Sequence, residues 1–190
     1  MKAFQTARLT IRGFRPDDWR DLQEYVSQKD VTKYDYEYPS SDEECKGLAE
    51  YFSRGSGFWA VCLKDTGKMI GHIVINQKEP KEFLTWHIGF VFNPTYHGKG
   101  YATESCKRIL KYVFEELGAH RVESACHPDN IPAWKLLERL SMRREAHHKK
   151  SGFVRKTLDG KPIWWDSYLY AILEEEWIER NGSPNDNISV

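Results

Sequence analysis

Residues 97–103, His-Gly-Lys-Gly-Tyr-Ala-Thr, combine two glycines with the start of a helical pattern, and this combination suits the binding of an anion. Gly98 and Gly100 allow the backbone to turn sharply and to approach a ligand closely. A helix that begins near Ala102 leaves the N–H groups of its first turn unpaired, and its dipole favours a negative charge there. This segment, the glycine loop, therefore predicts a cradle for phosphate or pyrophosphate.

The glycine loop has three possible interpretations: a P-loop, a dinucleotide-binding fingerprint, or a plain turn. The string G-x-x-x-x-G-K-[ST] of a P-loop does not occur in the sequence. A dinucleotide fingerprint needs glycine where Thr103 stands, and it follows the first strand of a βαβ unit, whereas antiparallel strands are expected before this loop. A plain turn that connects a strand to a helix is the third interpretation.

Apolar periodicity predicts the elements on either side of the glycine loop. The run from 83 to 92 is typical of a strand, and Asn93-Pro94 ends it because proline lacks the N–H of a ladder bond. Apolar residues then recur at helical spacing from 102 to 117, and Gly118 stands at the expected cap. Further strands are expected at residues 9–12, 58–63, 69–76, 121–126, 142–148 and 167–173, and further helices at 16–28, 41–54 and 131–140.

This order of elements predicts a mixed α/β architecture with antiparallel hairpins rather than a regular alternation of strands and helices. A length of 190 residues is enough for one domain with a substantial core. We expect that domain at residues 1–179, followed by a loose tail at 180–190 that is rich in polar residues, glycine and proline.

The composition narrows the class of protein. Lys plus Arg number 28 and Asp plus Glu also number 28, which argues against a broad nucleic-acid-binding surface. The sequence has no 18-residue apolar run that predicts a membrane span and no apolar secretion signal near its start, so we expect a cytoplasmic protein. The cysteines form no C-x-x-C pair, so reduced thiols are expected rather than disulfides or a metal site; they are Cys45, Cys62, Cys106 and Cys126.

Several separated stretches occur in an order that matches a known superfamily. They are residues 6–12 (TARLTIR), 88–94 (IGFVFNP), 97–104 (HGKGYATE), 130–140 (NIPAWKLLERL) and 165–168 (WDSY). Together they closely resemble the GNAT acetyltransferase superfamily, and within it the RimJ/RimL-like branch of ribosomal-protein N-terminal acetyltransferases. The resemblance runs from Thr6 to Trp177. It implies the GNAT fold, an α/β (α+β) architecture with a mixed, mostly antiparallel sheet of six or seven strands, split by a V-shaped cleft and flanked by about four helices.

The resemblance implies acetyl-CoA as co-substrate in that cleft, with its pyrophosphate on the glycine loop. The family pattern Q/R-x-x-G-x-G/A maps onto residues 97–102, where His97 replaces the usual Gln or Arg. The residues assigned to acetyl-CoA are Phe90, Val91, Phe92, His97, Gly98, Lys99, Gly100, Tyr101, Ala102, Thr103, Asn130 and Lys135. Asn130 is also a good helix N-cap and Lys135 fits a solvated helix face, so both keep a structural alternative.

The resemblance also implies direct transfer of an acetyl group from the thioester to a primary amine. An amine attacks only when neutral, so a base that titrates near neutrality is needed. His87 stands where many relatives carry Glu, two residues before Gly89, and is the candidate base; the alternative is a strand residue that only fills space beside Trp86. Leu137 replaces the tyrosine that serves as acid in the family, and a backbone N–H of residues 90–92 is the expected oxyanion donor.

Tyr34, Tyr36 and Glu37 are the candidate acceptor residues, because aromatic and acidic side chains suit a cationic amine. An ordinary aromatic-rich loop is the alternative. The acceptor can be a protein N-terminal α-amine or a small-molecule amine, and a homodimer is compatible with the sequence. Two other functions stay open: a non-catalytic CoA-binding or sensing module on the same fold, and an oligomeric interaction protein without a ligand.

Overall fold

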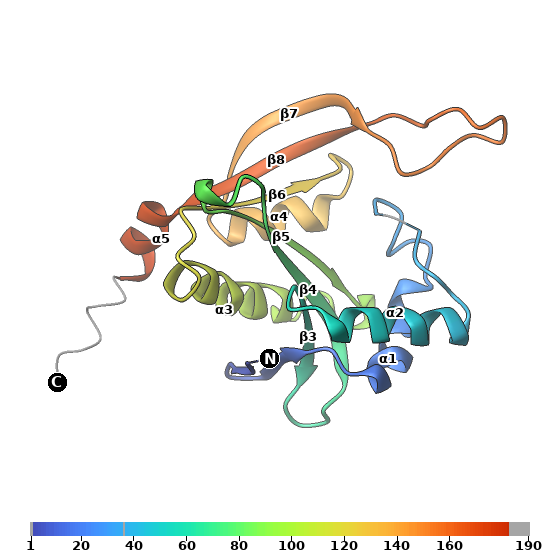
Figure 1. Ribbon diagram of the computed structural model, residues 1–190, viewed down its shortest axis with the longest axis horizontal. Helices are drawn as coiled ribbons and strands as arrows, with labels where there is room; N and C mark the ends of the chain where they lie inside the picture. The colour runs from blue at the N-terminus through green and yellow to red at the C-terminus, as the bar shows by residue number, and fades with distance from the viewer. Residues whose placement is uncertain (1, 36, 183–190) are drawn as a thin grey trace.

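One mixed sheet of eight strands runs through the part of the chain that the computed structural model describes, residues 2–35 and 37–182 (Figure 1). Its order is β1-β2-β3-β4-β5-β6-β8-β7, and every neighbouring pair is antiparallel except β5 and β6, which are parallel. The strands are β1 (Phe4–Gln5), β2 (Leu9–Gly13), β3 (Phe58–Leu63), β4 (Met69–Gln77), β5 (Thr85–Phe92), β6 (Arg121–Cys126), β7 (Arg143–Gly152) and β8 (Trp165–Leu173). The mixed, mostly antiparallel architecture expected from the sequence is confirmed.

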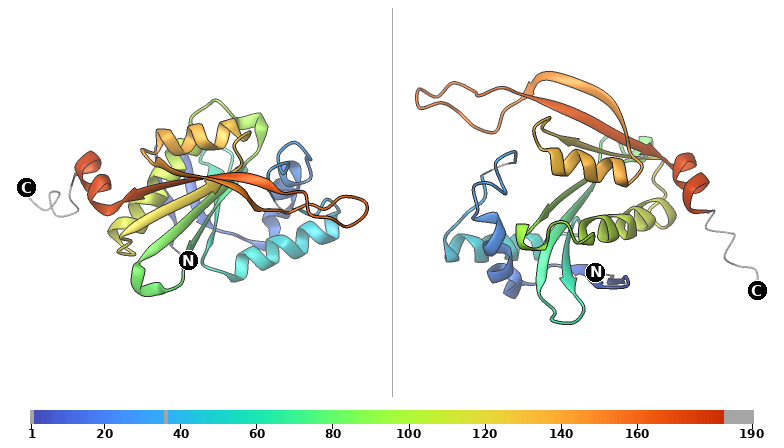
Figure 2. Two further views of the ribbon diagram at one scale, coloured as in Figure 1. Left: turned by 90° about the horizontal axis from the view of Figure 1, so that it is seen from above. Right: turned by 180° about the vertical axis from the view of Figure 1, so that it is seen from behind.

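Five α-helices flank the sheet within the same described residues: α1 (Trp19–Val26), α2 (Asp42–Arg54), α3 (Tyr101–Glu115), α4 (Ile131–Arg139) and α5 (Glu174–Asn181). Helices α3 and α4 cover one face of the sheet, and α1 and α2 pack on the opposite face over β3 and β4 (Figure 2). Of the helices described, none is long and apolar enough to cross a membrane.

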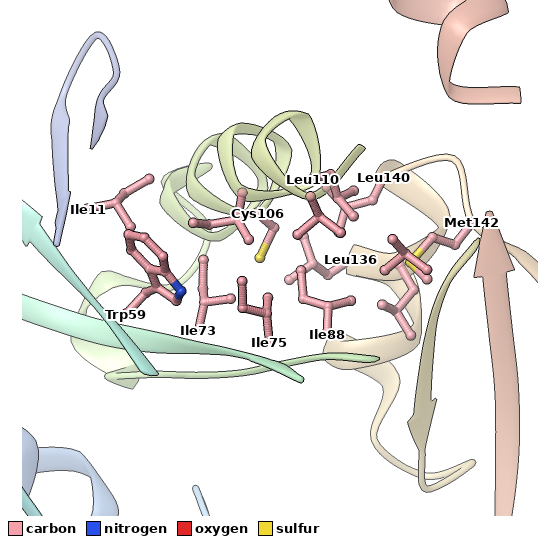
Figure 3. Packing of buried hydrophobic residues seen from close by; sticks show 14 of the residues in the cluster. Ile11, Trp59, Ile73, Ile75, Ile88, Cys106, Leu110, Leu136, Leu140 and Met142 are labelled. Atoms are coloured by element: carbon pink, nitrogen blue, oxygen red, sulfur yellow. The ribbon is translucent and has the colours of Figure 1, made fainter. Parts of the chain in front are cut away.

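The larger core lies between the sheet and helices α3 and α4 (Figure 3). Ile73 and Ile88 from the sheet meet Cys106 and Leu110 from α3, and all four side chains are fully buried. Side chains alternate between the two faces of a strand. Because Ile88 faces α3, its neighbour His87 belongs to the opposite face of the sheet.

Two elements were not predicted from the sequence. The two-residue β1 brings the described sheet to eight strands where six or seven were expected, and α5 is a fifth helix where about four were expected. The sequence of α5 contains only two apolar residues, so it shows no helical stripe. One of them, Trp177, stacks on Phe114 of α3 with ring centroids 5.4 Å apart, and this contact fixes the helix. Helix α5 reaches Asn181, inside the expected tail, and residues 183–190 of that tail lie outside the described residues.

Most predicted boundaries agree with the structure to within two residues. The capping box at the start of α2 is formed: the Glu44 N–H donates to Ser41 Oγ at 3.4 Å. Strand β5 begins at Thr85 rather than at Phe83, because Lys81–Phe83 forms a turn of 3-10 helix. The strand still ends at Phe92 before Asn93-Pro94, as expected.

Candidate functional site

The parallel contact between β5 and β6 is short. The two strands pair only through residues 85–87 and 121–123, although both continue beyond this point. Residues 88–92 of β5 and 124–126 of β6 therefore run on without pairing to each other, and we call this region the splay. Figure 1 shows β5 and β6 diverging there.

The splay exposes one edge of the β5 backbone. The N–H and C=O groups of successive residues in a strand point alternately to its two sides. The Lys78 N–H donates to Thr85 O at 2.8 Å and the Asn93 N–H donates to Ile70 O at 2.9 Å, so the odd-numbered residues of β5 face β4. The N–H groups of residues 90 and 92 accordingly point into the splay, whereas the N–H of Ile88 still belongs to the last paired position, His87 with Glu123.

The glycine loop ends at an uncapped helix. Gly98 has φ 73° and Gly100 has φ 82°, values in the left-handed region that side-chain-bearing residues rarely adopt. Gly100 is the N-cap of α3 and offers no side chain to the first turn. Within residues 2–35 and 37–182, the six N–H groups of residues 98–103 donate no hydrogen bond. This geometry fits a pyrophosphate, which would accept from several of these donors at once.

His97 holds the glycine loop to the end of β5. Its Nε2 lies 3.1 Å from the carbonyl oxygen of Phe92, and because a carbonyl only accepts, this ring nitrogen must carry the proton. The imidazole is thus hydrogen-bonded to the backbone at the position where the family pattern has Gln or Arg. The next side chain, Lys99, places Nζ 5.3 Å above the ring of Tyr96.

His87 lies at the apex of the splay, half-buried on the face away from α3. A Cβ atom added to Gly89 would stand 3.4 Å from His87 Cε1, so the absence of a side chain at Gly89 leaves room for the imidazole to lean along the strand. Burial lowers the pKa of His87, the Glu123 charge opposes that shift, and the Lys78 charge adds to it. The net effect is a pKa below the usual value, so the ring is neutral at pH 7 and can accept a proton.

Glu123 stands beside His87 as its partner in the parallel pair, and the sequence analysis did not single it out. Glu123 as a residue is 8% exposed, and its carboxylate forms an ion pair with Lys78 and accepts from Arg121 Nε at 3.3 Å. Burial raises the pKa of Glu123, but the two cations outweigh this and hold it below its usual range. Glu123 therefore keeps its charge next to the imidazole at neutral pH.

Three segments distant in the sequence meet beyond the end of β6. Tyr34, from the connection between α1 and α2, stacks on His127 with ring centroids 4.7 Å apart and an interplanar angle of 15°. His127 in turn contacts Trp165 of β8 edge-on at 5.4 Å. Among the candidate acceptor residues, Tyr34 is thus brought against His127, which directly follows β6, and Glu37 is exposed, whereas Tyr36 lies outside the described residues.

The α4 residues have well-defined structural roles. Asn130 caps the helix, since its side-chain oxygen accepts from the Ala133 N–H at 3.3 Å, and the predicted N-cap is confirmed. Lys135 is exposed, with Nζ 5.7 Å above the ring of Trp134. Leu137 is fully buried in the larger core, so its position offers no acid to the splay.

The thiols are free within the described residues, and those of Cys45, Cys62 and Cys106 are buried. Cys126 ends β6, and burial raises its pKa to about 11, so it stays protonated at pH 7 and is a poor nucleophile. No group of three His, Cys, Asp or Glu side chains in residues 2–35 and 37–182 is placed to hold a metal ion.

Comparisons with known proteins agree on one family. Residues 8–143, more than half of the chain, match the acetyltransferase (GNAT) domain. The uncharacterised N-acetyltransferase YnaD of Bacillus subtilis (strain 168) is 40% identical over 174 residues, covering 90% of this chain and 97% of YnaD. YdaF of the same organism, a proposed ribosomal N-acetyltransferase, is 26% identical over 178 residues, covering 89% and 93%. The crystal structure of a GNAT-family acetyltransferase from Bacillus anthracis superposes with a TM-score of 0.81 at 38% identity, covering 92% of this chain and all of the other.

Proposed function

Because the chain belongs to the GNAT acetyltransferase family and is therefore an acetyltransferase, we propose that it moves the acetyl group of acetyl-CoA directly to a primary amine at the apex of the splay. Enzymes of this fold use acetyl-CoA as the acetyl donor. The observation that carries the proposal is the end of β5–β6 pairing at His87 and Glu123. It leaves unpaired backbone donors beside a neutral imidazole, next to a loop that fits a pyrophosphate.

The donor would lie along the exposed edge of β5. The free N–H groups of residues 98–103 would hold the pyrophosphate at the start of α3. The pantetheine arm would then follow residues 90–92, where the backbone can pair with its amides as another strand would. Asn130, the N-cap of α4, and Lys135, in the middle of that helix, would border the arm from the other side of the splay.

His87 would take the proton of the acceptor ammonium. The neutral amine then attacks the thioester carbonyl and forms the N–C bond, and the resulting tetrahedral oxyanion is stabilised by a backbone N–H of residues 90–92. The carbonyl reforms as the C–S bond breaks. The sulfur leaves as a thiolate, the new amide nitrogen gives up its second proton to water, and water returns a proton to the thiolate, which suits a thiol whose pKa is roughly 8.5. A site without a dedicated acid is thus sufficient, in line with the burial of Leu137.

The acceptor would approach from the face that carries His87. The stack of Tyr34, His127 and Trp165 borders this approach and presents aromatic surface to a cationic amine. Tyr34 is the best supported of the predicted acceptor residues, and Tyr36 and Glu37 are proposed with it because they belong to the same connection. Both a protein N-terminal α-amine and a small amine suit this arrangement.

A panel of small amines and N-terminal peptides, assayed by thiol release from acetyl-CoA, tests the proposal. Turnover with any member also excludes a non-catalytic CoA-binding module. His87→Ala is expected to lower kcat/KM by about 100-fold or more while leaving CoA binding unchanged, since general base catalysis contributes that much. His120→Ala is the matched control, because His120 is exposed and directly precedes β6, at the end of this strand that is away from the splay. An unchanged kcat/KM and pH profile in His87→Ala would exclude His87 as the base.

A further inference from the structure

The turn between β1 and β2 is hydrogen-bonded to the first turn of α3. Thr6 Oγ1 donates to Glu104 Oε1 at 2.6 Å, and the Arg8 N–H donates to the same oxygen at 3.0 Å. Arg8 Nε donates to Glu104 Oε2 at 2.8 Å, and Arg8 Nη2 lies 2.7 Å from that oxygen. Both carboxylate oxygens are therefore occupied by donors from one short segment at the start of the chain.

The same arginine also lies against the glycine loop. Arg8 Nη1 donates to the Lys99 carbonyl oxygen at 2.9 Å, and its guanidinium carbon lies 4.5 Å from the ring centre of Tyr101. Between these two residues, a Cβ atom added to Gly100 would come within 3.3 Å of Arg8 Nη2. One guanidinium group thus touches three consecutive residues whose N–H groups are free for a ligand.

The charges explain why such a contact matters. Glu104 belongs to the first turn of α3, so its carboxylate would repel an anion bound at the same helix end. Burial raises the pKa of Glu104, but the hydrogen bonds from Thr6 and Arg8 outweigh it and hold the pKa below its usual range. The carboxylate is therefore ionised at pH 7, and the positive charge of Arg8 offsets it beside the glycine loop.

We propose that Arg8 and Glu104 form a positioning pair that fixes the glycine loop in its anion-binding shape and cancels the carboxylate beside it. Arg8 is a positioning residue and takes no part in proton transfer. Affinity for acetyl-CoA then depends on a residue far from the motif that binds the pyrophosphate. This inference rests on the proposed role of the glycine loop.

Four variants test the pair: Arg8→Gln, Arg8→Lys, Glu104→Gln and the double variant Arg8→Gln/Glu104→Gln. For each, the KM for acetyl-CoA, the KM for the amine, kcat, the Kd for CoA and the melting temperature without ligand are measured. Arg8→Gln is expected to raise the KM for acetyl-CoA and the Kd for CoA about tenfold, with kcat at saturation and the amine KM nearly unchanged. Arg8→Lys keeps the charge and loses the planar contacts, so it should fall between the wild type and Arg8→Gln.

The double variant separates electrostatics from general disruption. If the unpaired carboxylate opposes the anion, then Arg8→Gln/Glu104→Gln binds CoA more tightly than Arg8→Gln alone. The matched control is Lys2→Gln, because Lys2 pairs with Glu116 and so ties the same N-terminal segment to the other end of α3. This variant should leave the KM for acetyl-CoA unchanged.

The outcomes are distinguishable. If the melting temperature of Arg8→Gln and Arg8→Lys falls while KM and Kd stay at wild-type values, the pair is only structural and the inference is wrong. The inference also fails if the double variant binds no more tightly than Arg8→Gln. A wild-type enzyme that neither binds CoA nor turns over would instead overturn the proposed function itself.

Discussion

The buried histidine of β4 makes the stability of this fold depend on pH. His72 is fully buried, and its ring lies 5.9 Å from that of Phe14 and 5.6 Å from that of Phe52, centre to centre. Its Nδ1 is 2.7 Å from the Tyr25 hydroxyl, whereas Nε2 has no partner within the described residues. Burial lowers the pKa of His72 from 6.5 to about 3, so the ring is neutral in the folded protein at any ordinary pH.

The sign of the effect follows from proton binding. Between pH 6.5 and the folded pKa of about 3, the unfolded chain protonates His72 and the folded protein does not. Lowering the pH therefore favours unfolding, and the stability that the neutral ring supplies is fully present only above pH 6.5. Each pH unit in this window costs about 1.4 kcal/mol, so a change from pH 7 to pH 5 removes about 2 kcal/mol from the free energy of unfolding.

Urea unfolding at pH 7 and pH 5 measures the contribution of His72 to the pH dependence of stability when the wild type is compared with His72→Gln. Glutamine keeps an acceptor for the Tyr25 hydroxyl but does not titrate, and other titrating groups contribute equally to both proteins. The wild type should lose about 2 kcal/mol more than His72→Gln between the two pH values. Tyr25→Phe, which removes the hydrogen bond and keeps the imidazole, should retain the wild-type dependence on pH. If His72→Gln loses as much stability between pH 7 and pH 5 as the wild type does, the buried imidazole does not cause the loss of stability in acid.

Three further predictions concern the site and its support. Glu123→Gln removes the charge that raises the pKa of His87, so the acidic limb of the kcat/KM profile should move to lower pH; an upward shift would contradict this. Gly100→Ala and Gly118→Ala both place a side chain at positive φ, and each should lower the free energy of unfolding in urea by about 1 kcal/mol. Only Gly100→Ala should also raise the KM for acetyl-CoA, because its Cβ would approach Arg8 Nη2. Ser41→Ala should lower the free energy of unfolding by about 1 kcal/mol through loss of the α2 cap and leave the kinetic constants unchanged, which a steady-state assay checks.

Local signals were enough to predict most of the sheet. The sequence boundaries of β3 and β6 agree with the structure because turn residues stand on both sides of each strand. Strand β3 is a short apolar run between Gly57 and Gly67, and β6 lies between Gly118 and Pro128. Helix α5 lacked such a signal, since its stability comes from a stacking contact with α3 rather than from its own periodicity. Strand β1 is too short to show any alternation, and its pairing with β2 alone defines it.

The residues of the site also divide into those that local sequence predicts and those that only the fold brings together. The glycine loop could be predicted because its glycines and the helix that follows are contiguous in the sequence. Glu123 and His127 could not, because the first becomes a neighbour of His87 only through the parallel register and the second acquires its role only through the Tyr34 stack. The contact of Arg8 with Glu104 joins residues almost a hundred positions apart, and neither residue carries a signal for the other.

The three-residue pairing of β5 with β6 also bears on how the molecule assembles. Strands β1 to β5 follow one another as antiparallel neighbours in chain order, so this block can form from local contacts while the rest of the chain is still being synthesised. The block of β6, β8 and β7 would then join it, through a crossover that includes all of α3. With so few backbone rungs between the blocks, we expect their junction to exchange amide hydrogens sooner than either interior. A ligand bound between β5 and β6 would supply backbone hydrogen bonds that the two strands do not make to each other there, so the hydrogen bonding of the sheet would be complete only with the ligand bound.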